Sequence, residues 1–129
     1  MRKYRRNFSS KYGNTKVEYD GYVFDSRAEC DRWLELKILE RVGRIANLSR
    51  QATFELIPKT PACRQTGRGE RHVSYTCDFI YNDGAGQVTV EDVKSPATAK
   101  EKAYIIKRKL MKWRYPKIHF IEIIKGLDI

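Results

Sequence analysis

Asp92 and Lys94 close the run 88–94 (VTVEDVK), which has the residue pattern of a β-strand. Side chains on a strand point alternately to its two faces, so Asp92 and Lys94 are expected on one face with Val90, and Glu91 on the other. Charged groups on a buried face are unusual, because burying charge costs free energy unless the charge is paired or used. The spacing therefore marks this strand end as a candidate site of chemistry.

A second acid, Asp78, lies near the end of another strand-like run, 73–81. Two carboxylates held on strands can bind Mg²⁺ while leaving positions open for water and phosphate, as hydrolysis of a phosphodiester requires. Asp78 and Asp92 are the predicted ligands of Mg²⁺, or of Mn²⁺ in its place, and the backbone carbonyl of Val93 would supply a third oxygen. Lys94 would stabilise developing negative charge or help to activate the attacking water.

Glu29 is a further candidate, which would orient that water or bind a second ion. Each candidate also has a structural interpretation. Asp92 and Lys94 would merely pair on a sheet face, and Asp78 would be a solvated residue at a strand end. Glu29 would complete a capping box with Ser26, in which the glutamate carboxylate accepts from the N-cap amide. We favour catalytic roles for Glu29, Asp78, Asp92 and Lys94, judged on their expected geometry.

The hydrophobic pattern predicts an α/β domain in which one mixed sheet is flanked by helices. Strands 73–81 and 88–94 are joined by a short turn and should pair antiparallel, whereas a helical crossover should make the last strand parallel to its neighbour. The predicted elements are a hairpin over 17–24 around Asp20-Gly21, a helix from about Arg27 to Val42 after the N-cap Ser26, strands 45–57, 73–81 and 88–94, a helix from about Thr98 to Arg114 with N-cap Thr98, and a strand over 118–124.

Both predicted helices have an apolar stripe at helical spacing. In the first helix, Glu29 falls inside the predicted buried arc. The residues of that arc are Ala28, Trp33, Leu36 and Leu39, and those of the second helix are Ala103, Ile106, Leu110 and Trp113.

The bulk composition favours one domain, 1–129, with a polyanionic partner. Lys and Arg number 26 against 16 acids, so the formal charge is 26 − 16 = +10, which favours nucleic acid. The cysteines, Cys30, Cys63 and Cys77, lack C-x-x-C spacing and predict neither a disulfide framework nor a zinc site. His72 and His119 are interpreted as structural or surface residues. The sequence has no signal-peptide pattern and no apolar run long enough to span a bilayer, so we expect no membrane association and an intracellular, cytoplasmic location.

Two basic segments are candidates for contact with phosphates, and a third basic segment is interpreted only as a loop. Residues 1–16, which include Arg5 and Arg6, form either a frayed tail or a DNA-binding arm. Residues 59–71 read as a mobile basic loop. On the second predicted helix, cations recur every seven residues along one flank, which would follow a DNA backbone or would simply be solvated. These cations are Lys100, Lys107 and Arg114.

The helical Glu29, the strand acid Asp78, the Asp92-x-Lys94 pair and the basic helix after them resemble the PD-(D/E)XK nuclease superfamily. The order helix, three strands, helix, strand over residues 26–124 is similar to that superfamily's αβββαβ core, the restriction-endonuclease-like fold. More narrowly, the chain resembles small phage proteins in which Glu-Asp-Val-Lys follows a strand aspartate. It departs from the wider motif in having Cys77 in place of a proline and Asp92 in place of the commoner glutamate.

The resemblance implies a Mg²⁺-dependent DNA endonuclease, because the superfamily includes Holliday junction resolvases, restriction enzymes and repair nucleases. No base-reading helix motif is evident, so selection by DNA structure is expected. Branched recombination or replication intermediates often have two-fold symmetry, which would suit a homodimer. The sequence does not reveal the dimer surface, for which the hairpin 17–24 is one candidate. The alternatives are a non-catalytic nucleic-acid-binding module of the same fold and a nuclease subunit that needs a partner, such as a phage or host recombination or replication protein.

Overall fold

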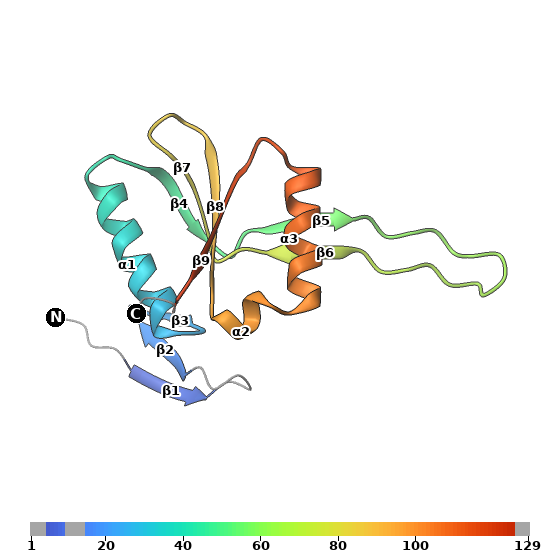
Figure 1. The fold of residues 1–129 in the computed structure, drawn as a ribbon, viewed down its shortest axis with the longest axis horizontal. Coiled ribbons are helices and arrows are strands. Elements are labelled where there is room, and N and C mark those ends of the chain that lie inside the picture. Colours follow the sequence, from blue (N-terminus) through green and yellow to red (C-terminus); the bar gives the residue numbers. More distant parts are fainter. Residues whose placement is uncertain (1–4, 10–14, 126–129) are drawn as a thin grey trace.

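The computed structural model describes residues 5–9, as backbone, and residues 15–125, and it shows a mixed α/β fold in them (Figure 1). No helix in these ranges is both long enough and apolar enough to cross a membrane. In chain order the elements are β1 (Arg5–Ser9), β2 (Thr15–Tyr19), β3 (Tyr22–Phe24), α1 (Arg27–Arg41), β4 (Ala46–Arg50), β5 (Thr53–Ile57), β6 (Val73–Thr76), β7 (Phe79–Asn82), β8 (Val88–Lys94), α2 (Pro96–Ala99), α3 (Lys102–Arg114) and β9 (His119–Ile124).

The central sheet has the strand order β4-β7-β8-β9. β7 pairs antiparallel with both β4 and β8, whereas β8 and β9 are parallel because the chain crosses over through α2 and α3. α1 lies on one side of this sheet and α3 on the other (Figure 1). The predicted α/β architecture, with a mixed sheet between helices, is confirmed.

Two predicted strands, 45–57 and 73–81, are each broken into two segments. Gln51 lies between β4 and β5 with φ +55°, a left-handed conformation that turns the chain out of the extended path. The hydrogen bonds continue through the break, since Gln51 N donates to Asp78 O at 3.0 Å and Cys77 N donates to Ala52 O at 3.0 Å. The two strands therefore form one long hairpin that bends: β4 and β7 join the central sheet, while β5 and β6 pair separately.

The second predicted helix is also wrong in its start and its continuity. Ser95, not Thr98, is the N-cap of α2, and Thr98 completes its capping box. Pro96 occupies the first turn, where its missing N–H has no cost. The helix α2 stops at Ala99 and α3 begins at Lys102, so the helix predicted over 98–114 is interrupted.

The apolar stripe predicted for α3 is wrong except at Leu110, which is partly buried against the core. The buried residues of α3 are Tyr104 and Met111, whereas Trp113 is 75% exposed and Ile106 is 57% exposed. Apolar side chains occur around much of this helix, and packing against the sheet decides which of them is buried. The apolar arc predicted for the first helix, α1, is confirmed. Its buried members are Glu29, Trp33 and Leu36, and its partly buried members are Ala28 and Leu39.

The N-terminal hairpin is confirmed, and β1 adds a strand to it. Asp20 and Gly21 both have positive φ, at +53° and +81°, as the predicted turn requires. The backbone of β1 pairs antiparallel with β2, which the sequence did not predict. The side chains of Arg5 and Arg6 lie outside what the structure describes, so their contact with DNA stays a prediction.

Side chains pack on both faces of the central sheet. The α1 face also receives the N-terminal sheet through Val17 and Phe24, and the α3 face receives the β5–β6 pair through Leu56 and Tyr75. All three cysteines are free, and both histidines are exposed, as expected from the sequence. The end of β8 lies between these two layers and carries the candidate site.

Candidate active site

β8 distributes its acids between the two faces as the alternation predicted. Glu91 points toward α1, where Arg32 donates to both of its carboxylate oxygens at 2.7 Å and the hydroxyl of Tyr81 donates to Oε2. Asp92 points to the α3 face together with Val90. Glu91 is therefore held in a buried structural ion pair, which leaves Asp92 as the acid of this strand that is available for chemistry.

Asp92 is only 1% exposed and is held from two sides. The hydroxyl of Tyr75 donates to Oδ2, and the Nζ of Lys94 lies 3.1 Å from Oδ1. Oδ1 is buried and accepts no hydrogen bond apart from this ion-pair contact with the lysine. Burial and the charge of Asp92 raise the pKa of Tyr75, so the phenol stays protonated and remains a donor.

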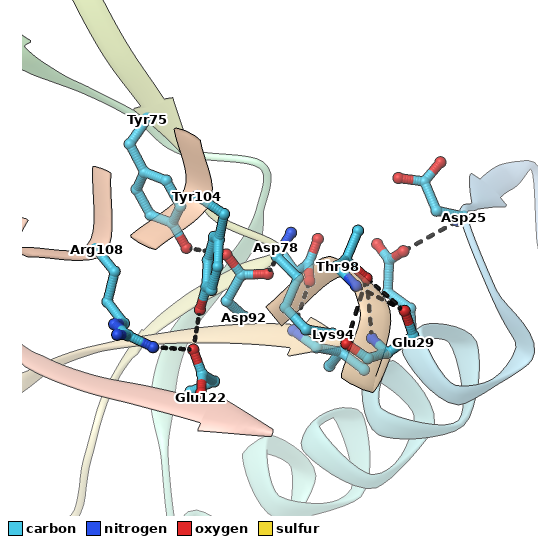
Figure 2. A network of polar contacts seen from close by, with 12 residues as sticks. Asp25, Glu29, Tyr75, Asp78, Asp92, Lys94, Thr98, Tyr104, Arg108 and Glu122 are labelled. Carbon is cyan, nitrogen blue, oxygen red and sulfur yellow. Dashed lines mark hydrogen bonds and ion pairs between the residues drawn. The ribbon is translucent and has the colours of Figure 1, made fainter. Parts of the chain in front are cut away.

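Asp78 lies at the bend of the long hairpin, between β6 and β7. Its Oδ2 accepts a hydrogen bond from the backbone N–H of Val93 at 2.7 Å, which places the carboxylate against the end of β8 beside Asp92 (Figure 2). The N–H and C=O of a strand residue point to the same side, so the carbonyl of Val93 is directed toward the edge that Asp78 occupies. The two predicted carboxylate ligands therefore lie close enough to interact, and the predicted carbonyl is directed to the side of β8 that Asp78 occupies.

Glu29 enters the site from the first turn of α1 and is 3% exposed. Ser26 caps the helix by accepting from Glu29 N at 3.1 Å, but the carboxylate of Glu29 accepts from Asp25 N at 2.9 Å. The predicted capping box is therefore wrong in its second half, because the glutamate reaches one residue further back. Arg50 lies 3.9 Å from its other oxygen.

The electrostatics of the site are those of crowded acids. Burial raises the pKa of Asp78 to about 9, with the charges of Glu29 and Asp92 adding to the effect. Burial also raises the pKa of Glu29 to about 7, against the hydrogen bond from the Asp25 amide. Burial alone would lower the pKa of Lys94, but the charges of Asp92, Asp78 and Glu29 outweigh it and raise the pKa. One lysine thus faces three acids, and a cation would relieve their repulsion.

This donor set fits Mg²⁺. Within residues 15–125, His, Cys, Asp and Glu side chains do not gather in threes at metal-binding spacing, so Asp78 and Asp92 form a carboxylate pair and not a closed cage. Mg²⁺ is commonly held by one or two carboxylates and keeps several waters. The buried Oδ1 of Asp92, whose charge is met only by the Lys94 ion pair, is an atom that such an ion would satisfy.

Sequence reasoning missed the residues that support the site. The ring of Tyr104 lies 4.9 Å below the Nζ of Lys94, and its hydroxyl donates to Glu122 on β9, which also pairs with Arg108 at 3.2 Å (Figure 2). The available signal was burial: a buried tyrosine needs a partner for its hydroxyl, and Tyr75 lay on a face that the alternation already predicted to be buried.

The predicted row of DNA-binding cations is not continuous. Lys100 is the C-cap of α2, whereas Lys107 and Arg114 belong to α3. Lys107 is partly buried, and Arg114 lies 3.6 Å from Glu55 in an ion pair. Because the helix breaks after Lys100, the seven-residue spacing does not place these three cations along one flank.

Comparison with known proteins identifies a family for the sequence but no activity. The profile of a family described as "Protein of unknown function (DUF1064)" matches residues 9–129. The sequence matches no curated protein.

Proposed function

Because the chain belongs to the DUF1064 family, whose function is unknown, we propose its activity from the site itself: Mg²⁺-dependent endonucleolytic hydrolysis of DNA. The observation that carries this proposal is the meeting of Asp78, Asp92 and Lys94 at the end of β8. The proposal is supported by the order of the four central-sheet strands and the two long helices, which is α1, β4, β7, β8, α3, β9 once the β5–β6 extension and the short α2 are set aside; this is the order of the PD-(D/E)XK core that the motif resembles.

Asp78 and Asp92, with the carbonyl of Val93, would hold the ion. The bound ion would polarise the scissile phosphate and lower the pKa of a coordinated water. Tyr75 keeps Asp92 in place, and the backbone N–H of Val93 does the same for Asp78. Both carboxylates are thus held before substrate arrives, which is how a site avoids reorganisation during the reaction.

Lys94 is suited to stabilise charge on the phosphate. Its side chain is 25% exposed, so a phosphate oxygen can reach Nζ from solvent. The ring of Tyr104 and the carboxylate of Asp92 hold the ammonium from two sides. A fixed cation at this point would stabilise the additional negative charge that develops as the phosphodiester is attacked.

Glu29 would orient the attacking water. Its carboxylate is buried and close enough to Asp78 for its charge to raise the pKa of that residue. One of its oxygens is held by the Asp25 amide and the other faces Arg50 at 3.9 Å. A carboxylate fixed in this way can accept a hydrogen bond from a water at the site without moving.

The net charge of +10 supports DNA as the substrate. Contacts to phosphates position a duplex without reading its bases, so we propose that the enzyme selects branched recombination or replication DNA by shape. A homodimer would match the two-fold symmetry of such junctions. Recombination or replication proteins of the phage or host are the proposed partners.

The test is cleavage of labelled duplex, single-stranded, flap and four-way-junction DNA with Mg²⁺ or Mn²⁺. Asp92→Ala and Lys94→Ala are expected to lose cutting, while Asp92→Ala keeps or gains DNA affinity because a negative charge near phosphate is removed. Glu35→Gln, which changes an exposed acid on α1, is the control and should cut normally. If the wild type binds these substrates but cuts none of them with either metal, the protein is a binding module and not a nuclease.

A further inference from the structure

The segment between β5 and β6 forms a projecting arm, residues 58–72 (Figure 1). Every residue in it is exposed, yet its two limbs are tied together. Thr60 N donates to Glu70 O at 3.0 Å, and Cys63 N donates to Arg68 O at 2.8 Å. The arm is therefore a loop without strand structure whose two limbs are joined by backbone hydrogen bonds, and its mobility stays a prediction.

Close approach of the limbs depends on a glycine. A Cβ at Gly69 would lie 2.3 Å from the carbonyl oxygen of Thr60, and the nearby Pro61 backbone leaves little space for adjustment. Any side chain at this position would force the limbs apart. The shape of the arm can thus be changed without changing its charge.

The arm is strongly basic. Its charged residues sum to 4 − 1 = +3, which is a large share of the +10 carried by the whole chain. These side chains are exposed and do not contribute to a hydrophobic core. The cations are Lys59, Arg64, Arg68 and Arg71, and the single acid is Glu70.

We infer that this arm is a second DNA-binding element that enters the major groove of the duplex next to the cleavage site. The identification of DNA as the partner of the arm rests on the proposed function. A two-stranded ribbon fits the major groove, which is about 12 Å wide. The limb from 58 to 63, before the turn that starts at residue 64, spans at most about 17 Å when fully extended, which exceeds the width of that groove. Arginines at the turn would then reach phosphates on both of its walls.

The position of the arm relative to the site supports this arrangement. The arm continues from the same long hairpin that carries Asp78 at its bend, and Tyr75 of β6 holds Asp92. The five residues of β5 separate the base of the arm from the bend at Asp78, roughly 17 Å at strand spacing, so a duplex that contacts the arm can extend back to the carboxylates. The arm would supply affinity and orientation, while the end of β8 would supply the chemistry.

The test measures DNA binding by fluorescence anisotropy, with a labelled duplex in EDTA over a series of salt concentrations. Arg64→Ser with Arg68→Ser removes two arm charges. Arg41→Ser with Arg44→Ser removes two exposed charges near the C-terminal end of α1 and is the matched control. Gly69→Val changes the shape of the arm at constant charge.

The arm variant should bind at least tenfold more weakly, and its salt slope should fall by roughly 2, since each lost phosphate contact contributes about 0.9. Gly69→Val should also weaken binding, whereas the control pair should change affinity less than twofold. Guanine N7, which faces the major groove, should be protected from methylation by the wild type and exposed with the arm variant.

Equal weakening by the arm and control variants would overturn the inference, because it would reflect net charge alone. Unchanged DNA affinity together with a loss of self-association in sedimentation would also overturn it, by assigning the arm to contact between copies. If the wild type binds through the arm but never cuts DNA, the arm inference stands and the endonuclease proposal fails. If the wild type cuts DNA and the arm variant binds and cuts normally, the endonuclease proposal stands and the arm inference fails.

Discussion

Tyr75 donates a hydrogen bond to Oδ2 of Asp92 from a strand that is not its neighbour in the sheet. The tyrosine belongs to β6, beyond the bend at Asp78, and the aspartate belongs to β8. Two residues of the same bent hairpin therefore act on the end of β8: Asp78 contributes a carboxylate directly, and Tyr75 orients the other one. Removing the phenolic hydroxyl tests whether that orientation matters.

Tyr75→Phe should lower the apparent affinity for Mg²⁺ in DNA cleavage by about 10- to 100-fold, because groups that orient a metal ligand have effects of this size. The measurement is cleavage rate against Mg²⁺ concentration. Tyr81→Phe is the matched control, since it removes an equivalent hydrogen bond to Glu91 and should leave the Mg²⁺ dependence unchanged. A similar change in both variants would assign Tyr75 a role in stability alone.

Asp92 and Glu91 are adjacent acids whose substitution should have opposite consequences. Glu91→Ala should destabilise the fold by about 3–5 kcal/mol, because it leaves the Arg32 guanidinium without its buried partner. Asp92→Asn should abolish cleavage while keeping stability near that of the wild type or above it. Urea denaturation and cleavage assays on both variants give the comparison. Full activity of Asp92→Asn would remove this acid from the site.

The metal-free protein should lose stability as pH rises. The folded-state pKa values of Glu29, about 7, and Asp78, about 9, lie above their ordinary values of 4.5 and 3.8. The folded state therefore holds protons that the unfolded chain has released, and this contribution is complete below about pH 4 and is lost as pH rises through 7 to 9. The Tm in EDTA is expected to fall from pH 5 to pH 9.

Asp78→Asn is the control for this pH dependence. It should flatten the decline and be more stable than the wild type at pH 9, because it removes one of the crowded charges. Added Mg²⁺ should raise the Tm of the wild type at pH 8 by mass action, and should do so much less for Asp78→Asn. A metal-free Tm that rises with pH would show that the acids are not crowded.

The contribution of Arg50 to stability should depend on its planar guanidinium group and not only on its positive charge. It donates to Val23 O at 3.0 Å and lies over the ring of Phe24 at 4.2 Å, which joins the N-terminal hairpin to the central sheet. Arg50→Lys should cost about 1–2 kcal/mol of unfolding free energy, because lysine cannot reproduce the planar stacking. Urea denaturation measures the loss, and Arg44→Lys, at an exposed position, should be neutral.

The parts of the fold that were predictable follow from local patterns. The alternation in 88–94 placed Asp92 and Glu91 on the correct faces, and Ser26 marked the start of α1. The bend at Gln51 was not predictable, because its positive φ leaves the alternation on both sides unchanged. Asp92 and Lys94 were predicted as site residues from charge on a buried strand face, and Glu29 from its place in the buried arc of the first helix. Tyr104, Glu122 and Arg108 meet only after the crossover brings β9 beside β8, so sequence spacing does not reveal them.

The tight turn between β7 and β8 has a consequence for the order of folding. Asp78 and Asp92 lie on either side of this turn, so they meet when a short loop closes, and contacts of this kind form readily. Tyr104 and Glu122 reach the same place only through the parallel crossover, which has a larger entropic cost of closure. We therefore expect repulsion between the two carboxylates to oppose an early, local step of folding, and α3 to dock later on a strand pair whose charges are already together.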